Sequence, residues 1–358
     1  MAAPQSLFDL ELLAREKLPP QIFDFVAGAA EDEISLAHNR AAWQAIQLLP
    51  RVLVGVDSVD TSATVLGRPM PSPVILAPVA LHRLVHPDGE LATAQAAAAQ
   101  GATMTLSTMS SCTIEDVAAA ADGPKWFQLY CYKDRAVTER LVKRAEAAGY
   151  SALCLTVDVP RLGRRERDFR HSLGFPDDVT PVNFEGEVDI TQIPLGQRGS
   201  ALSAYAASLL DASLTWDDVG WLGSLSSMPL IIKGILAPED AVLAADHGVA
   251  AVVVSNHGGR QLDGTPAGVE VLPDVVAAAG DRLEVLVDGG VRRGTDVLKA
   301  LALGARAVLI GRPYVWGLAL YGEEGVARVL GMLQEELELA MALSGVTSVS
   351  QISRALVR

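Results

Sequence analysis

The feature that most constrains this chain is a series of eight short apolar runs, each followed by a segment of helical character. The runs lack strict alternation and end at Gly or polar residues, which is typical of parallel strands covered on both faces. The stretches between them, such as 87–99 and 295–302, are rich in Ala and Leu and carry polar residues near their starts, as helices do. Eight strand–helix alternations predict a closed (β/α)8 TIM barrel of the α/β class. The expected strands are Val74–Pro78, Thr103–Ser107, Trp126–Tyr130, Ala152–Asp158, Leu230–Lys233, Ala251–Ser255, Glu284–Asp288 and Ala307–Gly311.

One connection is much longer than a single strand–helix unit. The stretch between Asp158 and Leu230 predicts an insertion after the fourth strand, at about 162–228, with its polar, Gly- and Pro-containing part around 171–200. A long loop at the C-terminal face of a barrel is usually a lid or a mobile binding loop. Before the barrel, which we expect at about 70–320, lies a helical preface. It holds a predicted helix over 18–40 and a turn over 67–71 that closes the barrel bottom, and we expect 1–358 to form a single domain.

Composition excludes several classes of protein. The net charge of −14 argues against a nucleic-acid partner, since binding a phosphate backbone needs clustered Lys and Arg. The sequence has no apolar run of about 18 residues, so no membrane span is expected. The N-terminus lacks the features of a signal peptide and the C-terminus is not a peroxisomal address. The three cysteines have no metal-ligand spacing, so we expect no metal, reduced thiols and a cytoplasmic location.

Polar side chains cluster at the C-terminal ends of the apolar runs. Active sites of (β/α)8 barrels lie at that face because the loops after the strands converge there. A protein without a site would spread its polar residues over both ends, so the pattern favours an enzyme. The clustered residues are Ser107, Gln128, Tyr130, Thr156, Asp158, Lys233, Ser255, Asn256, His257, Asp288 and Arg312.

The segment 255–263, Ser-Asn-His-Gly-Gly-Arg-Gln-Leu-Asp, is the most informative. His257 follows a strand, where a neutral imidazole can accept a proton near physiological pH. The two glycines after it allow a sharp turn that brings Arg260 toward the same pocket, and a guanidinium can bind a carboxylate through two hydrogen bonds. Asp158 is a candidate partner for His257, although an N-cap or an ordinary salt bridge also explains it. A further basic cluster, 161–167, follows Asp158 and offers a second guanidinium.

Glycine-rich segments end the last two strands. In 288–294 and 310–313, glycines allow backbone N–H groups to approach a phosphate, and the next helix N-terminus adds a favourable dipole. No Gly-x-Gly-x-x-Gly order is present, so a Rossmann nucleotide site is not supported. Lys233 has three interpretations from the residues alone: a Schiff base, a positive charge against an electron-rich cofactor, or a buried lysine paired with a carboxylate.

Over almost its whole length the chain resembles the FMN-dependent 2-hydroxy acid oxidases and dehydrogenases. The segment 255–261 is highly specific to that family. The matching segments are Phe23–Asp32, Ala77–Ala80, His86–Glu90, Phe127–Arg135, Thr156–Glu166, Ser255–Asp263 and Asp288–Asp296.

The resemblance implies FMN as cofactor and a role for each matching residue. His257 would be the catalytic base, supported by Asp158, and Tyr130 would hydrogen-bond the reacting group. Arg165 and Arg260 would hold the substrate carboxylate. Lys233 would stabilise the reduced flavin by its charge, which settles its role within the family. The flavin ring would contact Pro78, Val79, Ala80, Ser107, Gln128, Thr156 and Ser255, and the ribityl phosphate would contact Asp288, Gly289, Gly290, Arg292, Gly311 and Arg312.

The chain departs from the family pattern around the substrate. Phe25 stands where many members acting on short acids have tyrosine, Met109 replaces a tryptophan of glycolate oxidase, and Val79 replaces a threonine. A more apolar pocket favours a bulky or aromatic (S)-2-hydroxy acid such as mandelate or 4-hydroxymandelate. We expect oxygen as acceptor, giving hydrogen peroxide, and a homotetramer. The alternatives are a dehydrogenase with a quinone or another acceptor, a lactate-type monooxygenase, and, in a different class, a Schiff-base aldolase on Lys233.

Overall fold

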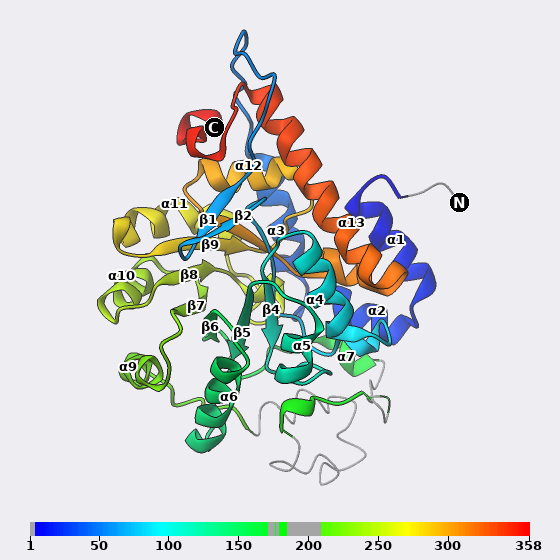
Figure 1. Cartoon of the computed structure of the whole chain (residues 1–358), viewed down its shortest axis with the longest axis vertical. Coiled ribbons are helices and arrows are strands. Elements are labelled where there is room, and N and C mark those ends of the chain that lie inside the picture. The colour runs from blue at the N-terminus through cyan, green and yellow to red at the C-terminus, as the bar shows by residue number, and fades with distance from the viewer. Residues whose placement is uncertain (1–3, 171–175, 177–178, 185–208) are drawn as a thin grey trace.

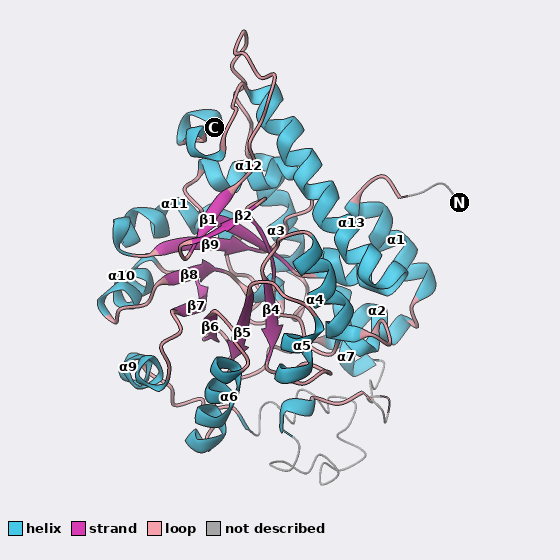
Figure 2. Ribbon diagram, in the orientation of Figure 1, coloured by secondary structure: helices cyan, strands magenta, loops and turns pink. Residues whose placement is uncertain are grey.

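Eight parallel strands close into a barrel in the computed structural model, which describes residues 4–170, 176, 179–184 and 209–358 (Figures 1 and 2). The predicted (β/α)8 fold is therefore confirmed, and every expected strand is present with ends within two residues of those predicted, because short runs of Val, Ile and Leu bury both faces. In spatial order the barrel is β10 (Ala307–Ile310), β3 (Val74–Leu76), β4 (Met104–Ser107), β5 (Lys125–Leu129), β6 (Ala152–Thr156), β7 (Leu230–Ile235), β8 (Ala251–Val254) and β9 (Glu284–Asp288).

Helices surround the barrel and cover the outer faces of its strands (Figure 2). The last of them, α13, is long and is interrupted at Gly322, whose φ of 61° departs from helical geometry. No helix in the described part of the chain is long and apolar enough to cross a membrane. The surrounding helices are α4 (Gly89–Ala99), α5 (Ile114–Ala120), α6 (Arg135–Ala147), α9 (Trp216–Leu225), α10 (Pro238–Asp246), α11 (Gly268–Ala279), α12 (Gly294–Ala302) and α13 (Arg312–Ser344).

A hairpin closes the bottom of the barrel. Its strands β1 (Ala63–Val65) and β2 (Arg68–Met70) are antiparallel, and Val65 and Met70 pack into the cluster that fills the barrel interior. The expected turn over 67–71 is thus shorter than predicted: it consists of Leu66 and Gly67, both at positive φ, and β2 follows at once. Closing the bottom leaves the opposite end, where the strands point, as the place for a ligand.

The preface differs from the single helix predicted over 18–40. It consists of α1 (Leu7–Lys17), α2 (Pro20–Ala27) and α3 (Ile34–Ala45). The chain leaves α2 at Gly28, which is extended, and enters α3 from Glu33, which has a φ of 60°. The prediction failed because the carbonyls at the end of α2 accept hydrogen bonds from arginines distant in sequence, which composition does not reveal.

The predicted insertion over 162–228 is too long at its C-terminal end, because α9 is the regular barrel helix between β6 and β7. Within the remainder the structure describes α7 (Glu166–Arg170) and a short 3-10 helix, Val182–Phe184. Most of the expected lid, 171–175 and 185–200, lies outside the described residues.

Candidate active site

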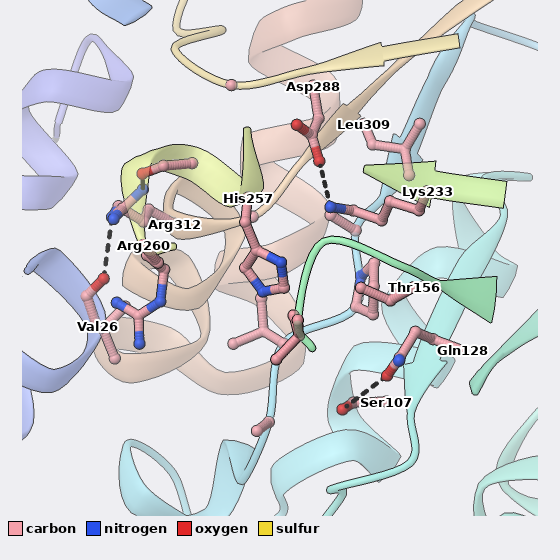
Figure 3. Close-up of a pocket in the computed structure, with 18 of the residues that line it drawn as sticks. Val26, Ser107, Gln128, Thr156, Lys233, His257, Arg260, Asp288, Leu309 and Arg312 are labelled. Carbon is pink, nitrogen blue, oxygen red and sulfur yellow. Dashed lines mark hydrogen bonds and ion pairs between the residues drawn. The ribbon is translucent and has the colours of Figure 1, made fainter. Parts of the chain in front are cut away.

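A cavity lies at the carboxyl ends of the barrel strands, the end opposite the hairpin (Figure 3). Nearly all residues selected from the sequence meet there, because parallel strands deliver the residues at their ends to one face. Its lining includes Phe25, Pro78, Val79, Ala80, Ser107, Met109, Gln128, Tyr130, Thr156, Arg165, Lys233, His257, Arg260, Asp288, Gly289, Gly290, Arg292, Gly311 and Arg312.

Ser255 and Asp158 are not among the lining residues of this cavity. Ser255 is fully buried, and its hydroxyl oxygen accepts hydrogen bonds from Lys233 Nζ at 2.9 Å and from the His257 backbone N–H at 3.0 Å. Ser255 thus supports two site residues, and its expected contact with a cofactor ring stays a prediction. Asp158 likewise lies behind His257.

His257 and Asp158 form a hydrogen-bonded pair between the loops after β8 and β6. His257 Nδ1 lies 2.9 Å from Asp158 Oδ1, which favours the neutral tautomer with its proton on Nδ1 and leaves Nε2 to accept a proton. Burial lowers the pKa of His257, against the opposing effect of Asp158. Burial alone would raise the pKa of Asp158, but the charge and hydrogen bond of His257 lower it. The pair is thus an ionised carboxylate beside a neutral imidazole, as a general base requires.

Lys233 is buried within β7, two residues before its end, between two acidic groups. Its Nζ lies 3.0 Å from Asp288 Oδ2 (Figure 3) and also donates to Ser255 Oγ. Burial alone would lower the pKa of Lys233, but the nearby carboxylates of Asp288 and Asp158 raise it. A raised pKa favours the protonated amine, which does not attack a carbonyl, so the pairing with Asp288 argues against the Schiff-base alternative. The side chain instead places a fixed positive charge at the cavity wall.

The end of α2 holds two arginines in place. Arg260 Nη1 donates to the carbonyl oxygens of Phe25 at 2.9 Å and Gly28 at 2.8 Å, and Arg312 donates to Val26 and Gly28. A helix C-terminus is a favourable site for such cations because its last carbonyls lack partners within the helix. Because α2 ends here, its last carbonyl groups are available to hold Arg260 and Arg312 in the site.

Arg165 adds a third guanidinium to this corner, and its Nε lies 3.4 Å from the Arg260 carbonyl. Burial, followed by the charges of Arg165 and Arg312, lowers the pKa of Arg260 well below its ordinary value. Burial also lowers the pKa of Arg165. Like charges that are buried together favour binding of an anion, so this corner suits a carboxylate.

The remaining wall fits a ring with polar edges that carries a phosphate. Among the described residues, Gln128 Nε2, Thr156 Oγ1 and Asp288 Oδ1 are buried without a hydrogen-bond partner, although all three residues line the cavity. Buried polar atoms seldom stay unpaired, so they indicate a ligand. Arg292 and Arg312 also line the cavity, and burial lowers the pKa of both, that of Arg312 to about 10. The described residues contain no cluster of acidic, His or Cys side chains suited to a metal ion.

A base, an anion-binding corner and a cradle for a phosphorylated ring, all at the mouth of a (β/α)8 barrel, define a flavin-dependent oxidoreductase of small carboxylic acids. The chain belongs to the FMN-dependent dehydrogenase family, whose model matches residues 14–358. FMN is therefore its cofactor, and the residues above fit that group.

Known relatives are oxidases of 2-hydroxy acids. The chain is 50% identical over 350 residues to glycolate oxidase 1 of Oryza sativa subsp. indica, covering 98% of this chain and 94% of the relative. It is 49% identical to the L-lactate oxidase of a Nostoc species, with 98% and 97% covered. A crystal structure of mandelate oxidase with (S)-4-hydroxymandelic acid superposes with a TM-score of 0.94 at 45% identity, covering 99% of this chain and 98% of that one.

Sequence reasoning missed several apolar residues of the cavity. Val159 directly follows Asp158 and Leu162 is four residues after it, so their place near a site residue was a usable signal. Leu210 had no such signal: it reaches the cavity through an isolated bridge to Tyr132, distant in sequence. The other unpredicted lining residues are Val26, Ala77, Gly258, Val291, Leu309 and Ile310.

Proposed function

We propose that the protein oxidises an (S)-2-hydroxy acid to the 2-oxo acid and passes the electrons to oxygen, giving hydrogen peroxide. The observation that carries the proposal is that His257, paired with Asp158, faces the same cavity as Arg165 and Arg260. A carboxylate held by the two arginines lies within reach of the base. Bound FMN would supply the two-electron acceptor, and the residues that would hold it line the same cavity.

The chain's own residues provide binding, orientation and proton transfer. Arg165 and Arg260 fix the substrate carboxylate, and Tyr130 hydrogen-bonds the hydroxyl. Burial, with the charge of Asp158 next, raises the pKa of Tyr130 to about 12, so the phenol keeps its proton and acts as a donor. His257 Nε2 takes the substrate proton, and Asp158 stabilises the imidazolium that results. The positive charge of Lys233 would stabilise the negative charge that bound FMN gains when the substrate is oxidised.

The apolar lining of the cavity supports a bulky or aromatic substrate. Phe25, Met109, Val159, Leu162 and Leu210 line the same cavity as the base and the arginines. Phe25 and Met109 are themselves buried, so a ligand side chain in contact with them leaves water. The mandelate oxidase likeness also supports this choice. Mandelate and 4-hydroxymandelate are the proposed substrates.

Met109→Trp is expected to reverse the preference for a large substrate. The larger ring takes up space in the cavity, so kcat/KM for mandelate should fall by about tenfold or more, as a steric change of ~1–3 kcal/mol implies. Glycolate, which has no side chain, should be affected less. Steady-state kinetics with both acids checks this, and Met109→Leu is the control of similar volume. An equal loss for both acids would contradict an assignment of Met109 to the substrate wall.

The pH dependence follows from the lowered pKa of His257. The base acts when neutral, so kcat/KM should hold at neutral pH and fall as the pH drops through the pKa of His257, below its ordinary value of about 6.5. Asp158 raises that pKa, so Asp158→Asn should move the acid limb to lower pH. The plateau should also fall, because the imidazolium loses its counter-charge. If the acid limb of kcat/KM instead moved to higher pH in Asp158→Asn, the proposed interaction between His257 and Asp158 would be wrong.

The decisive test is an anaerobic screen of flavin bleaching with mandelate, 4-hydroxymandelate, lactate, glycolate and a long-chain 2-hydroxy acid. Its rates rank the substrates independently of the acceptor. Fastest reduction by an aromatic acid is expected, and faster reduction by glycolate than by mandelate would refute the aromatic preference. One peroxide per substrate oxidised identifies an oxidase. Slow reoxidation by oxygen would point to a dehydrogenase, and rapid oxygen uptake without release of peroxide would point to a monooxygenase.

We further propose a single domain, a cytoplasmic location and a homotetramer. One continuous apolar core extends from Leu7 to Val357, which supports the single domain. Cys112, Cys131 and Cys154 are free and buried, which suits a reducing compartment. Light scattering of the purified protein tests the tetramer, and cell fractionation tests the location.

A further inference from the structure

The segment after β6 that carries Arg165 is docked against the preface that carries Phe25. Helix α7 packs on α2, two elements far apart in the sequence that lie side by side (Figure 1). A backbone hydrogen bond of 2.8 Å from Glu31 N to the Arg164 carbonyl joins them directly before Arg165. The segments that carry Arg165 and Phe25 are therefore in direct contact with each other.

Arg167 makes the side-chain part of this contact. Its Nη1 donates to Asp24 Oδ1 at 3.1 Å, and its Nη2 forms a hydrogen-bonded ion pair with Glu33 Oε2. Asp24 lies in α2 and Glu33 directly precedes α3, so one guanidinium joins both ends of the turn between these helices. Burial would lower the pKa of Arg167, but the two carboxylates raise it. The aliphatic part lies against Gly28, where an added Cβ would stand 3.2 Å from Arg167 Cδ.

Both ends of this contact reach the cavity. Glu33 Oε1 also accepts from Ala29 N at 3.0 Å, so it fixes the turn whose Gly28 carbonyl holds Arg260. On the other side, Arg165 is two residues before Arg167. Its guanidinium has only long hydrogen bonds in the described part of the chain, 3.4 Å to the Arg260 carbonyl and 3.5 Å to Gln261 Oε1. Its position is thus set mainly by its backbone.

We propose that Arg167 is a positioning residue: by pairing with Asp24 and Glu33, it sets the distance between Arg165 and the Phe25–Arg260 side of the pocket and so the affinity for the substrate carboxylate. Arg167 does not line the cavity, so it acts through Arg165. The inference rests on the proposed function, in which Arg165 binds that carboxylate. Losing the pairing should weaken carboxylate binding and leave the rate at saturation largely unchanged, since His257 and Lys233 are held by other segments, through Asp158 and Ser255.

The central variant is Arg167→Met, which keeps the aliphatic contact and removes the charge. With (S)-mandelate we expect KM to rise about three- to tenfold while kcat changes less than about twofold. Glu33→Gln should give part of this effect, and the double variant should exceed Arg167→Met by little, because both changes remove one interaction. Arg167→Lys should recover part of the affinity, since an ammonium can pair with one carboxylate but lacks the planar fork.

The matched control is Arg170→Met, in the same helix. Arg170 pairs with Glu166 one turn away and is mostly exposed, so its loss should leave KM unchanged. A hydroxy amide substrate, (S)-mandelamide, tests the route of the effect. It lacks the carboxylate charge, so Arg167→Met should change its KM much less than that of mandelate. If Arg167→Met changed KM equally for mandelate and mandelamide, Arg167 would not act through Arg165 and would have only a general structural role.

A binding measurement removes any dependence on turnover. Phenylacetate, a carboxylate without the reacting hydroxyl, is titrated into the FMN-bound enzyme by calorimetry, and Arg167→Met should raise its Kd by the same factor as KM. Arg165→Met separates the two possible failures. If Arg165→Met leaves Kd unchanged, the proposed role of Arg165 is wrong; if it raises Kd and Arg167→Met does not, the positioning role alone is overturned.

Discussion

Replacing His257 by glutamine is expected to slow anaerobic reduction of the flavin by about 10²- to 10⁴-fold, the usual contribution of a general base. Glutamine is similar in length and can still hydrogen-bond to Asp158, but it cannot take up a proton. His257 lines the cavity, and its Nδ1 is hydrogen-bonded to Asp158. Its Nε2 is therefore the ring nitrogen that can accept a proton. Stopped-flow absorbance of the flavin with mandelate measures the rate.

The control for this variant is its cofactor and ligand binding. His257→Gln should keep FMN and bind phenylacetate nearly as the unchanged protein does, because the arginine corner is intact. Its rate should also lose the acid limb of the pH profile. A variant that retains the rate to within about threefold would show that another group is the base.

Replacing Lys233 by methionine should have two large effects. The rate of flavin reduction should fall by about 10²- to 10³-fold, the usual result of removing one preorganised electrostatic group. Stability should also fall, by about 3–5 kcal/mol, because Asp288 remains buried without its cation. Stopped-flow reduction and denaturant unfolding, both with excess FMN, measure the two effects.

A second substitution separates the stability effect from the catalytic one. Lys233→Met combined with Asp288→Asn removes the uncompensated carboxylate, so stability should largely return while the rate stays low. Recovery of both in the double variant would mean that Lys233 serves the fold alone. A rate in the single variant equal to that of the unchanged protein would refute the proposed charge at this position.

The barrel was predictable because its signal is local. Each strand is a short apolar run, and the order of runs along the chain gives the order of strands around the barrel. The glycines around His257 were equally informative: His257, Gly258 and Gly259 all adopt positive φ, a conformation that glycine favours. Once parallel strands are assumed, residues at their C-terminal ends must converge, so His257, Lys233 and Asp288 could be placed in one site without coordinates.

Contacts across long sequence separations were not predictable. Nothing near Leu210 in the sequence indicates that this residue pairs with Tyr132 and lines the cavity. Likewise, the residues 18–40 do not reveal that the carbonyl groups at the end of α2 accept hydrogen bonds from Arg260 and Arg312. The basic cluster 161–167 also left the role of each arginine open. The structure distinguishes them, with Arg165 in the cavity and Arg167 on Asp24 and Glu33.

The sequence by itself determined the fold class and the residues at the strand ends, because periodicity and turn chemistry are properties of neighbours in the chain. The FMN family was indicated by the resemblance of its motifs. Only the tertiary structure decided which side chains line the cavity and which support them from behind. Ser255 is the clearest case: the sequence places it at a strand end, but its side chain direction depends on Lys233, one strand away. Hydrogen-bond partners and burial are fixed by packing between distant segments, and no local pattern carries that information.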